Sequence, residues 1–212
     1  MPSHKIHIKI AQDINENLKL DNDSIMLGSV LPDLTINKNH GLSHFQYVDK
    51  YPYNLANANE FLKKYPNIRD DISIGYIIHL LTDSFYNDWF YKNYVLKEIN
   101  VLKGYKHNLF ESYDKYIMKH FKLNKFNSID VIKKIPKYED IVFNYEDLEK
   151  YINDYNNEIE QNCIDLEYSI EQQDILEELY SECIKYIESW LKDNNICKKE
   201  EEDYELRRCF NK

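Results

Sequence analysis

Apolar residues recur at every fourth position at the start of the chain, at Ile6, Ile10, Ile14 and Leu18. His7 and Ala11 widen this stripe by one position, and such spacing is that of one face of an α-helix. Pro2 and Ser3 suit a helix start. We therefore expect the chain to begin with an amphipathic helix that carries a histidine on its apolar side.

A second, shorter apolar segment ends abruptly at a proline. Ser24 follows a run of polar residues and can cap a helix, which should stop in the sequence Gly-Ser-Val-Leu-Pro-Asp at residues 28–33. It stops there because proline pushes the preceding residue out of the helical region of backbone space. Asp33 is therefore expected to follow a sharp turn.

The next segment, residues 35–53, shows no sustained period. It contains His40 and His44 together with a glycine and a proline, so we interpret it as a loop that packs over another part of the protein. A helix near Leu55 to Tyr65 should follow this loop.

The strongest apolar segment runs from Ile72 to about Asn93, after the acidic pair Asp70-Asp71. Its apolar residues would lie nearly all round a helical cylinder rather than on one side. A helix of this kind is buried against neighbours on every side. We expect it to be the central helix of the fold.

The remaining segments also have helical period. Further helices are expected at Val95–Val101, His107–Phe121, Asp130–Ile135, Tyr145–Tyr155 and Ile170–Leu191. No strand is convincing, and no repeat of 20 to 50 residues of the solenoid kind occurs. The sequence thus predicts an all-α protein, with one multi-helix domain over residues 1–195 and a charged C-terminal tail over residues 196–212.

Composition narrows the class further. The 212 residues include only four glycines and five prolines, which excludes collagen-like and linker-rich chains. The longest apolar run, Ile72 to Leu81, is interrupted by His79 and is shorter than the roughly 20 residues that a bilayer requires, so no transmembrane segment is expected. The start of the chain lacks the pattern of a secretory signal, and the four cysteines lack C-x-x-C pairing. These features predict a cytoplasmic protein with free thiols.

Charge is distributed unevenly along the chain. The net charge is -10, but residues 97–137 carry ten lysines against four acidic residues, a local balance of +6. Lysine runs usually form a solvated helix face. They can also form a positive wall beside a ligand that bears phosphate, and the sequence leaves both interpretations open.

The clearest candidate for chemistry lies inside the central helix. His79 and Asp83 are four residues apart and so share one helix face. A buried carboxylate is costly unless it is neutralised, paired or bound to a cation. The two groups could therefore satisfy each other through a hydrogen bond in the core, or they could be ligands of a metal ion.

Three upstream residues favour the metal interpretation. His7 on the first helix, Asp33 after the proline turn and His44 in the loop would complete a set of three imidazoles and two carboxylates with His79 and Asp83. Such a set suits zinc or a similar divalent ion. Five ligands exceed the needs of one tetrahedral ion, and a carboxylate such as Asp83 can bridge two ions. Asp33 and Asp83 are thus the candidate catalytic residues.

These spacings resemble the zinc-dependent phospholipase C family and the related fungal single-strand-specific nucleases, all-helical enzymes that use three zinc ions on phosphodiesters. The resemblance covers mainly residues 4–90. It rests on the His-x-x-x-Ala motif at His7, the Gly-x-x-x-Pro-Asp turn that ends at Asp33, a further histidine at position 44 and the His-x-x-x-Asp motif of His79 and Asp83.

The resemblance implies a particular division of the ligands. Asp33, His44, His79 and Asp83 would hold one zinc ion, while His7 and a bridging Asp83 would hold a second. Hydrolysis would then use a metal-bound hydroxide as the nucleophile.

The chain departs from the family at two places. The exported relatives ligate metal through an N-terminal tryptophan, which this chain lacks, and His4 could substitute for it. A histidine expected six residues after the His-x-x-x-Asp motif is replaced by Trp89. A third zinc would depend on His107 and Glu111, which have the required four-residue spacing, with Asp88 beside them; otherwise lysines such as those at positions 103 and 106 would stabilise the leaving group.

Other catalytic signatures are missing from the sequence. It contains no Gly-x-Ser-x-Gly elbow, no phosphate-binding glycine loop, no dinucleotide fingerprint and no His-Glu-x-x-His helix. We expect a zinc-dependent phosphodiester hydrolase that acts on a phospholipid, a nucleotide or single-stranded nucleic acid. The alternative is a non-catalytic binding or regulatory protein that retains a structural metal site.

Overall fold

The computed structural model describes residues 3–36, 40–46, 55–67, 70–95, 97, 105–161 and 170–196. In chain order its elements are α1 (His4–Leu18), α2 (Asn22–Gly28), η1 (Leu31–Asp33), α3 (His40–Ser43), α4 (Ala58–Lys64), α5 (Asp71–Phe90), the π-helical η2 (Tyr91–Val95), α6 (Tyr105–His120), η3 (Ile129–Lys134), α7 (Tyr145–Glu160) and α8 (Ile170–Asp193). Within these ranges the protein is all-helical, as the sequence predicts. An isolated bridge joins Thr35 to Phe143 without forming a strand.

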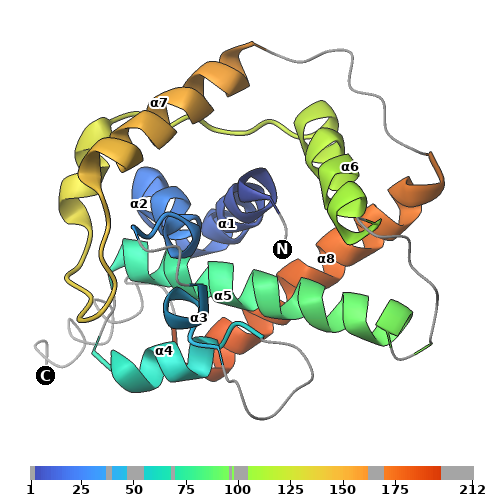
Figure 1. The fold of residues 1–212 in the computed structure, drawn as a ribbon, viewed down its shortest axis with the longest axis horizontal. Coiled ribbons are helices and arrows are strands. Elements are labelled where there is room, and N and C mark those ends of the chain that lie inside the picture. The colour runs from blue at the N-terminus through green and yellow to red at the C-terminus, as the bar shows by residue number, and fades with distance from the viewer. Residues whose placement is uncertain are drawn as a thin grey trace, which may run out of the picture.

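Helix α5 crosses the middle of the molecule, with α1 and α2 on one side and α8 behind it (Figure 1). All twelve residues from Ile72 to Asp83 are buried, and Asp70 caps the helix by accepting a hydrogen bond from the Ser73 backbone N–H. The prediction of a buried central helix is therefore confirmed. The apolar stripe of α1 faces α5, which brings His7 into the interior.

Helices α2 and α5 approach each other unusually closely. A Cβ atom added to Gly28 would lie 2.1 Å from the backbone oxygen of Ile72, and one added to Gly75 would lie 2.3 Å from the backbone oxygen of Ile25. Only hydrogen atoms fit between the two backbones at this crossing. The contact fixes where α2 ends, and with it the position of the turn that leads to Asp33.

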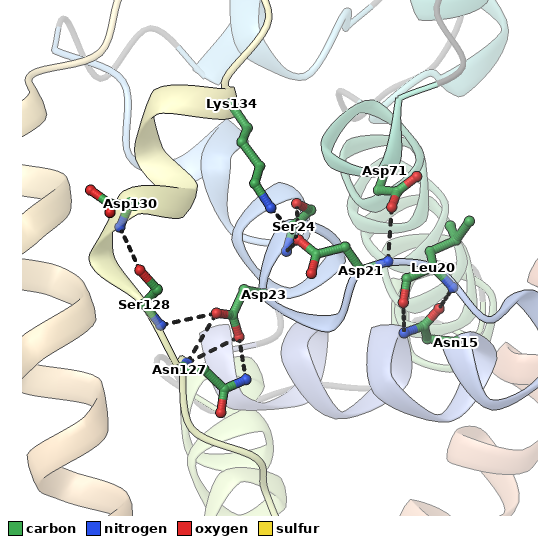
Figure 2. Close-up of polar contacts among 10 residues, drawn as sticks. All are labelled: Asn15, Leu20, Asp21, Asp23, Ser24, Asp71, Asn127, Ser128, Asp130 and Lys134. Atoms are coloured by element: carbon green, nitrogen blue, oxygen red, sulfur yellow. Dashed lines mark hydrogen bonds and ion pairs between the residues drawn. The ribbon is translucent and has the colours of Figure 1, made fainter.

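The start of α2 is held by acidic side chains (Figure 2). Asp21, rather than the expected Ser24, caps the helix, because its carboxylate accepts a hydrogen bond from the Ser24 N–H. Buried Asp23 accepts hydrogen bonds of 3.0–3.1 Å from the backbone N–H groups of Asn127 and Ser128. These bonds attach the segment before η3 to α2.

The segment interpreted as a loop contains a short helix, α3, directly before His44. Phe45 follows α3 by two residues, and its φ of 52° lies in the left-handed region that bulky residues rarely adopt. Packing holds Phe45 there, because its ring lies edge-on to Phe61 and Tyr76. The expectation of an irregular loop is thus wrong for residues 40–43, while residues 47–53 lie outside the described ranges.

Helices α6 and α8 pack near the C-terminal half of α5. Tyr86 donates a hydrogen bond of 2.7 Å to the Tyr113 hydroxyl of α6, and both rings are fully buried. Cys183 of α8 is a free, buried thiol, whereas the other three cysteines and the predicted tail from residue 197 lie outside the described residues. The expected helix at Val95–Val101 falls mostly outside them as well. No described helix has the length and apolar character needed to cross a membrane.

Candidate metal centre

Five predicted ligands meet at one place between α1, α5 and the turn after α2. His7, His44, His79 and Asp83 are completely buried, and the side chain of Asp33 is 9% exposed. Their ligand atoms form two overlapping groups that could hold a metal ion. One group is His7, His79 and Asp83, and the other is Asp33, His44 and His79.

The backbone after α2 orients His79. Its Nδ1 donates a hydrogen bond of 2.8 Å to the Ser29 carbonyl oxygen, since a carbonyl can only accept. The proton on Nδ1 leaves Nε2 with a lone pair, and Nε2 faces the other ligands. Such an outer hydrogen bond fixes the tautomer and the ring orientation of histidines that bind metal.

Contacts of the Nδ1 atom and the backbone orient His44. Its Nδ1 lies 3.0 Å from the Ser43 hydroxyl, and the Ser43 carbonyl in turn accepts a hydrogen bond from Tyr76 of α5. The His44 carbonyl accepts a 2.9 Å bond from the Asn57 N–H. These contacts point the Nε2 atom of His44 towards Asp33 and Asp83.

The spacing of the ligand atoms fits a tetrahedral ion. Bonds of about 2.0–2.2 Å at tetrahedral angles separate neighbouring ligand atoms by about 3.3–3.6 Å. His44 Nε2 lies 3.3 Å from Asp33 Oδ1, 3.3 Å from Asp83 Oδ2 and 3.1 Å from His79 Nε2. His79 Nε2 lies 3.7 Å from Asp83 Oδ2. His44 Nε2 thus lies at or near the spacing of ligands around a zinc-sized cation from three other candidate ligand atoms, one each of Asp33, Asp83 and His79.

The two oxygens of Asp83 face different imidazoles. Oδ2 faces His44 and His79, whereas Oδ1 lies 3.4 Å from His7 Nε2. Neither oxygen makes a hydrogen bond. The 3.7 Å separation from His79 is too long for the internal hydrogen bond that the sequence left open as an alternative. Asp83 is thus placed to bridge two cation positions.

His7 is buried without a hydrogen bond on either ring nitrogen. Its ring stacks on His79, with the centroids 4.0 Å apart. A buried polar atom without a partner costs about 1–3 kcal/mol. A cation between His7 Nε2 and Asp83 Oδ1 would supply the missing partner for both groups.

The protonation states suit cation binding. Burial lowers the pKa of His79 to about 3, so its imidazole is neutral at pH 7. Burial alone would raise the pKa of Asp83, but the contacts with His44 and His7 outweigh it and hold that pKa far below its ordinary range. The imidazoles around Asp33 lower its pKa in the same way. Both carboxylates are therefore ionised.

His44 carries the proton that balances these carboxylates when metal is removed. Burial lowers its pKa, but the contacts with Asp33 and Asp83 outweigh burial and raise the pKa from 6.5 to about 9. Folding then favours the protonated form, and this contribution is complete below pH 6.5 and lost as the pH rises through 9. It amounts to at most about 3 kcal/mol.

We therefore expect the metal-free protein to become less stable between pH 6.5 and pH 9. Urea unfolding of chelator-treated protein at the two pH values measures the loss. The His44→Gln variant is the control, because it lacks the titrating group and should lose much less stability over the same interval. An equal loss in both proteins would show that His44 does not carry this proton.

The centre has one edge that reaches solvent. His4, one turn before His7 in α1, places its Nε2 atom 3.4 Å from Asp33 Oδ2, and its side chain is 33% exposed. Asp33 thus contacts His44 through one oxygen and His4 through the other. The substitution of His4 for a missing N-terminal ligand stays a prediction, but the residue does lie beside the centre.

Two of the residues expected to hold a third ion, Glu111 and Asp88, form ion pairs with lysines. Glu111 is exposed and lies 3.2 Å from Lys115, and Asp88 lies 2.6 Å from Lys92. The side chain of His107 lies outside the described part of the chain, as do those of Lys103 and Lys106. No described contact places this group near His79.

Three lysines of the lysine-rich segment lie around a cavity away from the candidate ligands. Lys119, Lys122 and Lys125 line a cavity of about 970 Å³ between the end of α6 and the end of α7. None of the lining residues of this cavity is a candidate ligand. The interpretation of these lysines as a solvated face fits their position better than a positive wall at the metal centre.

Two supporting groups were missed in the sequence. The Ser29 carbonyl and the Ser43 hydroxyl orient the imidazoles, but a backbone oxygen and a serine beside a histidine carry no distinctive pattern.

Searches of protein-family models, curated proteins and solved structures find no match to this chain. The assignment of these residues as a candidate metal centre therefore rests on the positions of their ligand atoms.

Proposed function

We propose that this chain is a zinc-dependent phosphodiester hydrolase of the phospholipase C and zinc-nuclease type. The observation that carries the proposal is the division of Asp83, whose two oxygens face separate sets of imidazoles. A carboxylate shared in this way is the element that joins two ions in metal-dependent phosphoesterases.

Asp33, His44, His79 and Asp83 would hold the first ion, and His7 with Asp83 would hold the second. The mixture of imidazole and carboxylate ligands suits zinc. Two such ions, when bound, activate a water molecule near neutral pH and stabilise the charge that develops on a phosphoryl group.

Residues around the ligands orient them and exclude water from the centre. The Ser29 carbonyl keeps the His79 lone pair directed at the centre. Complete burial of His7 and His79 keeps bulk water away from the ligands, which strengthens electrostatic interactions there. The first position would have four protein ligands and the second two, so the coordination of the second ion would be completed by water or substrate.

The same burial supports a second candidate function. The four fully buried ligands would suit a closed structural metal site in a non-catalytic protein. The two functions differ in stoichiometry, since a structural site needs one ion and the hydrolase needs two.

Elemental analysis of protein purified without added metal tests the proposal directly. We expect two equivalents of zinc and hydrolysis of bis(p-nitrophenyl) phosphate that a chelator abolishes and added zinc restores. One tightly held ion without hydrolysis would favour the structural role. Protein that takes up no zinc under any loading condition would contradict both functions.

A further inference from the structure

The solvent-facing edge of the centre is formed by His4 and Asp33. His4 is 33% exposed and Asp33 is 9% exposed at the side chain, while His7, His44, His79 and Asp83 are completely buried. Among the described residues of the centre these two reach solvent, so we expect a ligand to approach the centre past them. The groups that surround this edge are the ones that a ligand would meet first.

Helix α7 contributes Tyr151 to this edge. The Tyr151 ring lies edge-on to His4, with the centroids 5.1 Å apart and the planes at 76°. Its ring is partly exposed, but its hydroxyl oxygen is buried and makes no hydrogen bond to the described chain. Asp33 is among the carboxylates whose charge acts on this hydroxyl. The Tyr151 ring thus lies beside this edge, and its hydroxyl is buried.

A buried hydroxyl without a hydrogen-bond partner destabilises the folded protein. Leaving it unsatisfied costs about 1–3 kcal/mol, and phenylalanine would fill the same space without that cost. The neighbouring Tyr155, one turn later on α7, shows the ordinary arrangement, because its hydroxyl donates a 3.0 Å hydrogen bond to the Asn124 carbonyl. The hydroxyl of Tyr151 has no such partner among the described residues.

We propose that the Tyr151 hydroxyl is a ligand-binding group of the centre and donates a hydrogen bond to a phosphoryl oxygen that enters at the edge formed by His4 and Asp33. This inference rests on the proposed function, since it assumes that the centre binds phosphoryl groups. Burial and the nearby carboxylates raise the pKa of Tyr151 well above 10, so the hydroxyl keeps its proton for donation.

The charges at this edge make binding depend on the metal. Without an ion, the protonated His44 balances only one of the two carboxylates that it contacts, those of Asp33 and Asp83. Lys5 lies 3.0 Å from Asp114 and 2.7 Å from Glu158, so its single charge is shared between two carboxylates. The edge is therefore acidic and repels an anion when the centre is empty. Cations at the centre would reverse this balance.

Inorganic phosphate is the probe for the test. Isothermal titration of the zinc-loaded full-length protein, after removal of excess zinc, should show phosphate binding that disappears in chelator-treated protein. Tyr151→Phe should weaken phosphate binding about tenfold or more, because a hydrogen bond to a charged group is lost. Tyr155→Phe should leave the phosphate affinity unchanged.

Stability gives an independent readout. Tyr151→Phe should keep the zinc content and should unfold at the same urea concentration as the wild type or a higher one. Tyr155→Phe should unfold at a lower concentration, because it loses a formed hydrogen bond. A clear loss of stability in Tyr151→Phe would show that its hydroxyl has a structural partner, which would overturn the inference.

The outcomes separate the two proposals. If zinc-loaded wild type binds phosphate and Tyr151→Phe binds it equally well, the role of Tyr151 is wrong while the proposed function stands. If the wild type takes up no zinc, or binds no phosphate when loaded, the proposed function fails and the role of Tyr151 fails with it.

Discussion

Replacement of Asp83 by asparagine is expected to release both ions and to abolish phosphodiester hydrolysis. An amide has nearly the same shape as the carboxylate, but it lacks the charge that offsets the ions and offers only one oxygen. Both cation positions use Asp83, so both should be lost together. Metal affinity should fall by more than the roughly 10–100-fold that follows loss of an outer-shell partner.

Zinc content and hydrolysis measured on the same preparation test this expectation. Asp71→Asn is the matched control, because it removes one carboxylate from the first turn of the same helix, where Asp71 accepts a 2.8 Å hydrogen bond from the Asp21 N–H. This control should keep both ions and the full rate. Full zinc occupancy in Asp83→Asn would reject the bridging role.

A methyl group at Gly75 is expected to destabilise the fold by about 3 kcal/mol or more, at the upper end of the usual cost of overpacking. The added Cβ atom would meet the Ile25 backbone oxygen at 2.3 Å, and backbone of a neighbouring helix cannot turn aside as a side chain can. Helix α2 would have to move away from α5. The Ser29 carbonyl would then leave His79, so Gly75→Ala should also weaken zinc binding.

Urea unfolding compares Gly75→Ala with Gly41→Ala, which adds the same methyl group at an exposed position of α3. The control should be neutral or slightly stabilising, because alanine favours helix over glycine by about 1 kcal/mol. A Gly75→Ala protein as stable as the wild type would mean that the helices can separate at this crossing without cost.

The sequence predicts those parts of the fold that follow from periodicity. The stripe that contains Ile6 and His7 and the nearly all-apolar segment after Asp71 each specify one helix and its buried face. The proline turn placed Asp33 at the end of a short helix. Where residues compete for one local role, the prediction was less reliable, as with Asp21 and Ser24 at the start of α2.

Convergence of the candidate ligands could be predicted as a hypothesis, but its details could not. Which oxygen of Asp83 faces His7 and which faces His44 depends on side-chain rotation within an assembled core. The same spacing that suggested a third metal pair at His107 and Glu111 is shared by helical ion pairs, and Glu111 lies beside Lys115. A spacing of four residues alone therefore does not identify ligands.

All the proposed ligands lie in the first 83 residues, ahead of α6, α7 and α8. During synthesis the complete ligand set has been made while residues 84–212 are still to be added, an interval of about 6–26 s at usual elongation rates. Any divalent ion in the cell can compete for the nascent chain in that interval. The metal acquired in the cell then reflects the ions free at that moment as well as the selectivity of the finished protein.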